Sequence, residues 1–381
     1  MEKRHCFGML YKYELLKILK NKVALVTFIV AFCFAFIQGE FEVSGNITPK
    51  DLEKYQEIDD RAVDQSLLNE LKEISDDAGN IQDENRKGYE QLSAWMEETI
   101  GYRAPIKELD IDTVYSKREK NIQEGYDAMR LTQGEIGFWA NKEKEVDKPF
   151  LFHETIRSGG ILEGTTNYML LMAIIIGASL SMIFASETQR KTDPMLRVAI
   201  NGNKELYFAK ILAGMSYIFV CIIVLLITFY AYAACRWGIT GMDCMVQSYR
   251  PLARIDMTIG ELLVIILMLL FCGILLISSF ALFLSNVTRN GVATMTIVIG
   301  SFIGLLVATL HVPLKLRVLS QILYMLPGTM VSSSILYDYR LIRIGKYFMS
   351  YQIAPIVYIL FSIAFIVAGY VFYDKYEIKS N

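Results

Sequence analysis

Residues 259–284 read IGELLVIILMLLFCGILLISSFALFL, and they decide the class of this protein. Apart from Glu261 near its beginning the run carries no charge, and it exceeds the roughly 20 mostly apolar residues that a helix needs to cross a bilayer. Five further runs meet or approach this length: residues 19–38, 166–185, 209–234, 291–310 and 353–373. Hydrophobic residues make up 53% of the chain and cluster in these runs, which a single soluble core could not bury. The sequence therefore predicts an all-α integral membrane protein with six transmembrane helices and a helical extracytoplasmic domain.

Basic residues near the spans predict the orientation, because lysine and arginine are in excess on the cytoplasmic side of membrane proteins. They gather before the first span and between the second and third: Lys3, Arg4, Lys12, Lys17, Lys20, Lys22, Arg190, Lys191, Arg197 and Lys204. We therefore expect a multi-pass protein of the cell membrane with both termini in the cytoplasm. Residues 312–350 would lie outside, although they carry five basic residues. A cleaved signal peptide is the alternative for the first run, but residues 31–39 offer a poor cleavage site.

The composition changes abruptly between the first two spans. Residues 39–165 carry 29 acidic and 16 basic residues, a net charge of −13, so the rest of the chain is +11. This acidity either attracts cationic solutes or only solvates exposed helices. We expect three parts: an interfacial helix and first span at 1–38, an extracytoplasmic domain at 39–165, and a five-helix transmembrane region at 166–381.

Three amphipathic stretches make the extracytoplasmic domain helical. The first begins at Thr48 and Pro49 and repeats apolar residues every three to five positions up to Ile74. The second covers residues 89–100, and the third covers residues 115–136. The charged segment 116–120 within the third is most simply a solvated face. We expect antiparallel helices that fold without the spans, and no disulfide supports them because residues 39–165 contain no cysteine.

A polar segment, residues 186–204, separates the second and third spans. It contains a set of charged and hydroxyl residues that the two spans hold at the membrane surface: Glu187, Thr188, Arg190, Lys191, Thr192 and Arg197. A short polar element in that position is suited to docking a cytoplasmic partner. The sequence thus makes 186–204 the first candidate for a functional site.

The order of these parts resembles the permeases of ABC-2 type transporters. In that family a Glu leaves the second span, a Gly-Thr pair follows, and basic residues precede the third span. Here Glu187 and Thr192 match, Lys191 stands where Gly is usual, and Asn201-Gly202 would supply the turn. The interfacial pattern of residues 11–22 (YKYELLKILKNK), the Pro-Phe approach at 148–153 and the aromatic-then-charged ending at 372–375 are similar to the same family.

The resemblance implies the permease subunit of an ATP-driven exporter, as an identical or related pair of chains with ABC ATPase subunits. Segment 186–204 would then couple the spans to the ATPase. The chain has no Gly-x-x-x-x-Gly-Lys-Ser/Thr phosphate loop, so ATP and Mg would be bound by the partner and the chain itself would not be an enzyme. Besides these proteins, membrane lipid is the expected partner, and nucleic acid is not. The alternative is a membrane-anchored sensor or immunity protein that binds an extracellular ligand without transport.

Segment 324–334 (YMLPGTMVSSS) is the candidate lining of the transport pathway. A Pro-Gly break between apolar pieces is typical of short re-entrant helices, which membranes tolerate only against protein or a water-filled cavity. The candidate lining residues are Pro327, Gly328, Ser332 and Ser333, with Glu261 as a further one, although a carboxylate so near the interface is more often simply hydrated.

Other chemistry is sparse in the sequence. The three histidines, His5, His153 and His311, are too scattered for a metal site. Cys235 and Cys244 share one predicted external loop and would either pair or remain free thiols. The predicted spans show no interior charge pair of the kind that an ion pathway needs, so we expect an amphipathic or hydrophobic substrate. A cationic antimicrobial peptide is the first choice, and a lipid-like or drug-like molecule is the second.

Overall fold

The computed structural model describes residues 2–44, 48, 52–76, 81, 86–101, 106–189, 192 and 204–375. Six helices in this part of the chain are long and apolar enough to span a membrane. They are α2 (Lys22–Ser44), α8 with α9 (Ile156–Leu180 and Met182–Gln189), α11 (Lys204–Arg236), α13 (Ile259–Thr288), α14 (Gly291–His311) and α17 (Ala354–Lys375). Each overlaps one predicted span, so the prediction of a helical membrane protein with six candidate spans is confirmed at this level.

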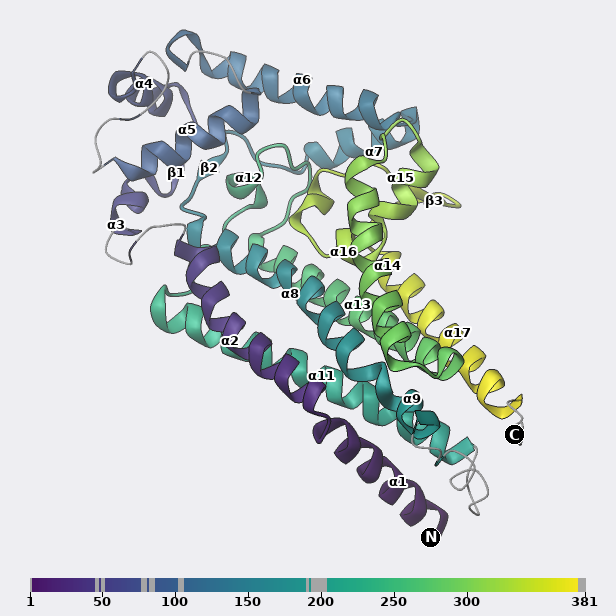
Figure 1. Ribbon diagram of the computed structural model, residues 1–381. Helices are drawn as coiled ribbons and strands as arrows, with labels where there is room; N and C mark the ends of the chain where they lie inside the picture. The colour runs from purple at the N-terminus through teal and green to yellow at the C-terminus, as the bar shows by residue number, and fades with distance from the viewer. Residues whose placement is uncertain are drawn as a thin grey trace.

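The six helices form an elongated bundle with both chain termini at one end (Figure 1). α8 lies at the centre: the most apolar window of α8 and α9 is 72% buried, against 17% in α14 and 22% in α17. Small residues permit close approach, because Ala24, Ala31 and Ala35 of α2 are almost fully buried. The outer surfaces of α2, α14 and α17 remain apolar and exposed, as lipid-facing surfaces are.

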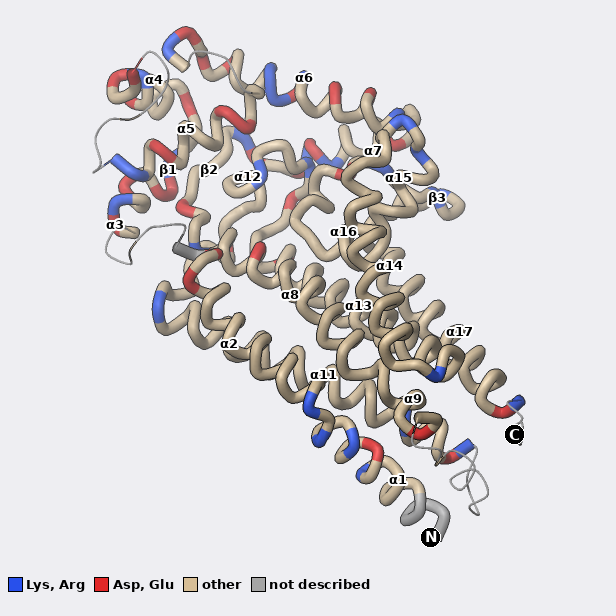
Figure 2. Tube along the Cα trace, viewed as in Figure 1, with Lys and Arg blue, Asp and Glu red and all other residues tan. Residues whose placement is uncertain are grey.

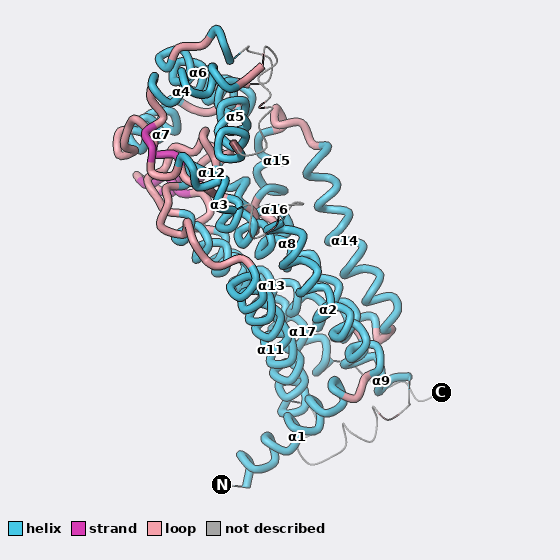
Figure 3. The backbone as a smooth tube through the Cα atoms, turned by 90° about the vertical axis from the view of Figure 1, so that its left-hand side faces the viewer, coloured by secondary structure: helices cyan, strands magenta, loops and turns pink. Residues whose placement is uncertain are grey.

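A helical domain sits on the end of the bundle opposite the termini (Figures 1 and 3). Its elements are α3 (Leu52–Tyr55), β1 (Arg61–Ala62), α4 (Gln65–Ile74), α5 (Lys87–Ile100), α6 (Ile111–Met129), α7 (Gln133–Glu143) and β2 (Leu151–Phe152). β1 and β2 pair antiparallel, with Arg61 opposite Phe152, and this closes the domain just before α8 begins. We call this end of the molecule the domain end and the other the terminal end.

Two connections between spans also belong to the domain end. The first joins α11 to α13 through α12 (Val246–Tyr249), and the second joins α14 to α17 through α15 (Arg317–Tyr324), α16 (Pro327–Met330), β3 (Ile342–Ile344) and β4 (Tyr347–Met349). The indole nitrogen of Trp95 donates to the carbonyl of Gln247 at 2.8 Å, and that of Trp139 donates to the carbonyl of Tyr339 at 2.7 Å. The domain is therefore attached to the bundle by hydrogen bonds to both connections, in addition to the continuous chain.

Two stretches of the domain that the sequence predicts as single helices are interrupted in the structure. The stretch that the sequence predicts over residues 48–74 is interrupted by a 3₁₀ turn, by Asp60 with a φ of 60° and by β1, so only its ends are α-helical. The stretch over 115–136 breaks at Arg130, whose φ is 54°. Thr132 and Glu135 then form a capping box that begins α7, because each satisfies a backbone N–H of the other.

Charged residues are concentrated at the two ends of the molecule (Figure 2). The middle of the bundle is almost free of them, as a chain that crosses hydrocarbon requires. At the terminal end the chain turns tightly from α13 to α14: Arg289 takes the left-handed conformation, and the side chain of Asn290 accepts from the N–H groups of Val292 and Ala293. Charged groups that could form a functional site therefore lie at the two ends.

Candidate functional site

Four charged residues meet at the terminal end, and we call Glu14, Lys17, Glu187 and Lys210 the terminal cluster. Glu187 lies near the end of α9 and is 5% exposed. Its Oε1 atom accepts from Nζ of Lys210 at 2.5 Å and from Nζ of Lys17 at 2.9 Å. One carboxylate of the predicted coupling segment thus connects α9 to both α1 (Glu2–Leu19) and α11.

Glu14 completes the cluster from α1. Its Oε1 atom accepts from Lys17 at 2.6 Å, and its Oε2 atom accepts from Lys210 at 3.1 Å. Lys210 is fully buried, and its ammonium lies 5.5 Å from the centre of the Phe184 ring. With two carboxylates and two ammonium groups the cluster is formally neutral, which reduces the cost of burying each charge.

The electrostatics of the cluster favour the charged form of Lys17. Burial disfavours that charge, but Glu14 and Glu187 together outweigh burial, so the pKa of Lys17 is raised above its usual value of 10.5. Lys17 therefore keeps its positive charge over the whole neutral pH range.

The structure changes the role expected for Glu187. We predicted that this carboxylate would contact a partner directly, but it points into the molecule and is occupied by two lysines. The backbone N–H of Thr192 donates to the carbonyl of Glu187 at 3.0 Å, so Thr192 lies close to the end of α9. Thr188 is half-buried beside Glu187. Arg190, Lys191 and Arg197 lie outside the described residues.

Sequence reasoning missed Glu14 and Lys210 as members of this site. Lys210 falls inside the predicted span 209–234, and the prediction that the spans hold no charge pair is wrong at this point because Lys210 pairs with Glu187 and Glu14. The available signal was the lysine itself, since a charge inside a span nearly always has a partner.

The predicted pathway residues divide into two groups. Pro327 and Gly328 line a cavity of about 460 Å³, together with residues of α13, α14 and α17. Ser332 and Ser333 do not line it. Glu261 is exposed and forms a capping box with Thr258 at the start of α13, so its role is to begin that helix. The alternative reading of Glu261 as a hydrated interfacial carboxylate agrees with this position.

Ser333 belongs instead to a polar group around Glu163 of α8. The Oε1 atom of Glu163 accepts from the hydroxyl of Ser333 at 2.6 Å, from the hydroxyl of Tyr249 at 2.7 Å and from Arg250 at 3.1 Å. The group ties the domain end of α8 to both connections between spans. Glu163 was not a candidate in the sequence because it precedes the apolar run that begins at residue 166.

A second buried ionic cluster lies within the domain end, and we call Arg118, Glu143, Lys148 and Arg254 the domain cluster. Arg118 is 1% exposed, so the interpretation of segment 116–120 as a solvated face is wrong at this residue. Its Nη1 atom donates to Glu143 at 2.6 Å, while Nε and Nη2 donate to the carbonyls of Pro251 and Ala253 at 2.6 and 2.8 Å. Arg254 and Lys148 also contact Glu143, at 3.0 and 2.7 Å.

The described part of the chain was expected to show either a disulfide or free thiols at Cys235 and Cys244, and no metal site. Cys235 and Cys244 are both free thiols, which resolves the two options left by the sequence. No group of three or more histidine, cysteine or carboxylate residues among the described residues could hold a metal ion.

Comparison with known proteins adds no assignment, since no family model, curated protein or solved structure matches the chain. The two ionic clusters and the apolar cavity therefore have to be interpreted from their own geometry.

Proposed function

We propose that the chain is the membrane-spanning subunit of an ATP-driven exporter of the ABC-2 type. The observation that carries this proposal is the terminal cluster, which fastens Glu187, at the beginning of the polar segment 186–204, to α1 and α11. A partner that pushes on this segment would move two further helices with it. This is the mechanical requirement for a subunit whose energy source lies outside the membrane.

In this proposal the chain works with an ABC ATPase subunit and with a second permease chain. ATP and Mg are bound by the ATPase, and hydrolysis of the ATP drives a movement between two states. Displacement of α9 passes to α11 through Glu187 and Lys210, and to α1 through Glu187 and Lys17. The bundle then alternates between states that open toward opposite sides of the membrane.

The cargo we propose is amphipathic or hydrophobic. The cavity at Pro327 and Gly328 is lined almost entirely by apolar side chains, which suits an apolar portion of a cargo molecule. The net charge of −13 between the first two spans suits a cationic portion. A cationic antimicrobial peptide combines both properties, and a lipid-like or drug-like molecule uses the cavity alone.

Affinity purification in a mild detergent tests the partner assignment. A nucleotide-binding subunit should be retained by the wild-type chain and by the Glu187→Ala variant, because Glu187 is buried. Export and cargo-stimulated ATP hydrolysis should fall at least several-fold in Glu187→Ala, since the cluster loses the carboxylate that joins three helices. Asp374→Asn is the matched control, because Asp374 is an exposed carboxylate at the same end.

Two results would refute this reading. Normal export by Glu187→Ala would exclude the terminal cluster from coupling. Purification without any ATPase, combined with specific binding of an extracellular ligand, would favour the sensor or immunity protein.

The orientation has its own test, which needs an exposed site on the domain. Lys120 is suitable because its side chain is 75% exposed. In a background without Cys235, a Lys120→Cys variant should react with an impermeant maleimide added to whole cells. Reaction only after lysis would place the domain in the cytoplasm and reverse the proposed topology.

A further inference from the structure

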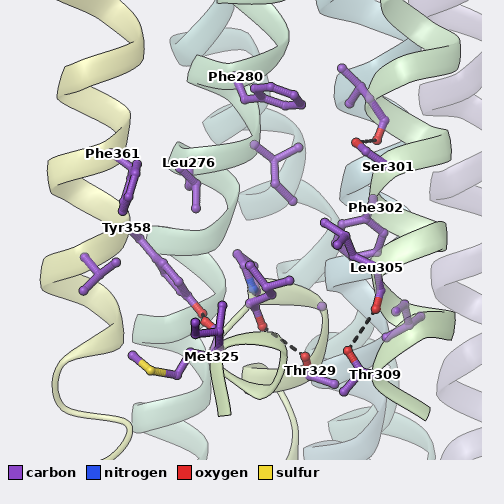
Figure 4. A pocket seen from close by; sticks show the side chains of 18 of the residues that line it. Leu276, Phe280, Ser301, Phe302, Leu305, Thr309, Met325, Thr329, Tyr358 and Phe361 are labelled. Atoms are coloured by element: carbon purple, nitrogen blue, oxygen red, sulfur yellow. Dashed lines mark hydrogen bonds between the residues drawn. The ribbon is translucent and has the colours of Figure 1, made fainter. Parts of the chain in front are cut away.

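The cavity at the domain end has the shape of an open slot between two spans. It is lined by α13 at the back, by α14 and α17 on its sides, and by α15 and α16 at the domain end (Figure 4). Leu305 of α14, Phe361 of α17 and Ile322 of α15 all line it, and they are 43%, 55% and 56% exposed. The slot therefore opens onto the apolar outer surface of the bundle.

Every hydroxyl group that lines the slot is already occupied by a backbone carbonyl. Tyr358 donates to Met325 at 2.6 Å, and Thr329 donates to Leu323 at 2.8 Å. Ser301 and Thr309 donate within α14, to the carbonyls of Val298 and Leu305. Because the protons of these four hydroxyl groups are already donated to the protein and the rest of the lining side chains are apolar, the wall favours an apolar occupant.

The length of the slot matches one leaflet of a bilayer. Its lining on α14 runs from Val298 to Thr309, which is about 16 Å of helix at about 1.5 Å per residue. Half of the roughly 30 Å hydrocarbon core is about 15 Å. On α14 and α17 most of the lining residues lie in the half of the helix nearer the domain, while Leu276 to Phe280 lie near the middle of α13, so the slot extends from the domain end to about the middle of the bundle.

We propose that this slot holds one acyl chain of a membrane lipid from the leaflet on the domain side. A cavity of about 460 Å³ lies in the range that binds small apolar ligands, and apolar cavities take up apolar molecules rather than water. A helix of a second copy is a poorer occupant, because a helix about 10–12 Å across would fit only about one turn in this volume. The inference does not depend on the proposed function, since lipid binding requires no ATPase.

Photo-crosslinking tests the proposal. The purified chain in lipid nanodiscs is irradiated with a phospholipid that carries a diazirine near the end of one acyl chain. Crosslinked peptides should include residues 276–280 and 357–365. Replacing Leu276, which points into the slot, with Trp fills part of it and should lower this crosslinking several-fold. Leu360→Trp is the matched control, because Leu360 is 60% exposed on α17 outside the slot.

The remaining outcomes overturn the proposal in distinguishable ways. Equal loss of crosslinking in both variants would mean that the label reports only lipid around the protein. Displacement of the label by a compact neutral hydrophobic compound, but not by added unlabelled phospholipid, would assign the slot to a free apolar solute. Crosslinking that occurs in monomeric but not dimeric fractions would assign it to a second copy of the chain.

Discussion

The two ionic clusters lie at opposite ends of the molecule and differ in their most deeply buried cation, Arg118 in the domain cluster and Lys210 in the terminal cluster. In the domain cluster, Arg118 makes hydrogen bonds to a carboxylate and to two backbone carbonyls. In the terminal cluster, Lys210 contacts two carboxylates and a single carbonyl, that of Ile183, at 3.4 Å. Both clusters join elements that are distant in sequence, but only the arginine fixes several bond directions at once.

This difference indicates what each cluster can do. A guanidinium is a planar fork whose donors impose geometry, whereas an ammonium is a point charge on a flexible stem that tolerates sliding of its partners. The domain cluster is therefore suited to a fixed attachment between the domain and the α11–α13 connection. The terminal cluster is suited to a joint, as the proposed coupling of α9 to α1 and α11 requires.

The largest expected effect in this comparison follows loss of the arginine fork. Arg118→Met should destabilise the domain end by about 4 kcal/mol, because it breaks a buried ion pair and leaves two carbonyls without their donor. Hydrogen exchange should accelerate in α6, α7 and residues 250–254 together. Lys120→Met is the control, since Lys120 lies on the same helix and is exposed. Exchange that increases in α6 alone would show that Arg118 does not hold the connection to the domain.

A somewhat smaller effect is expected at the terminal end. Lys210→Met should cost about 3 kcal/mol, because Glu14 and Glu187 remain buried with only Lys17 between them. Hydrogen exchange should increase in α1 while the domain stays protected, and Lys12→Met should leave α1 unchanged because Lys12 is exposed. Adding Glu187→Gln to Lys210→Met should restore part of the loss, since it removes an unpaired charge. No recovery would mean that the two residues act independently.

The contrast between bundle and domain also explains how much the sequence could predict. The spans were predictable because hydrocarbon imposes long apolar runs, and each of the six runs overlaps an observed helix. The domain was predicted as helical, and its second predicted stretch, residues 89–100, ends where α5 ends. The interruptions of its helices were not predicted, because they occur at Asp60 and Arg130. These residues adopt left-handed conformations, which the sequence would suggest only at a glycine.

The candidate sites were harder to predict for a related reason. The sequence singled out Glu187 through its position after a span, but it could not show that Lys210 and Glu14 face it from other helices. Arg118 lies in a run of charges, where exposure is the ordinary expectation, and its partners come from residues 143 and 251–254. Long-range pairing of this kind depends on tertiary contacts, which periodicity within one helix does not encode.

Extremes of pH should separate the two clusters. Burial opposes the charge of Glu143, but Arg118 and Lys148 with Arg254 outweigh it, so the pKa of Glu143 is lowered in the folded protein. That contribution to stability is present above the ordinary carboxyl pKa of 4.5 and is lost as pH falls through the lowered value. The raised pKa of Lys17 has the opposite consequence: its contribution is full below 10.5 and is lost as pH rises through the folded value.

Tryptophan fluorescence provides the measurement for this pH prediction. All three tryptophans lie at the domain end, because Trp95 and Trp139 belong to α5 and α7 and Trp237 directly follows α11, so acid should shift their emission first. A Tyr13→Trp variant adds a reporter on α1, where Tyr13 is exposed, and its emission should change in alkali as Lys17 loses its charge. If acid released α1 before it disturbed the domain, the assignment of opposite pH sensitivities to the two clusters would be wrong.

The smallest effect is expected from an arginine pair that has the geometry of the domain cluster without its burial. Glu70 accepts from both terminal nitrogens of Arg61 at 2.6 and 2.7 Å and from the hydroxyl of Tyr89 at 2.6 Å, and these bonds lower the pKa of Glu70 to about 2. The side chains of Arg61 and Glu70 are nevertheless 36% and 41% exposed. Water screens such a pair, so Glu70→Gln should cost no more than about 1 kcal/mol in thermal unfolding of the domain. A loss of stability as large as that of Arg118→Met would mean that the geometry of the arginine alone sets the strength of these contacts. Burial would then not distinguish the domain cluster from an ordinary surface pair.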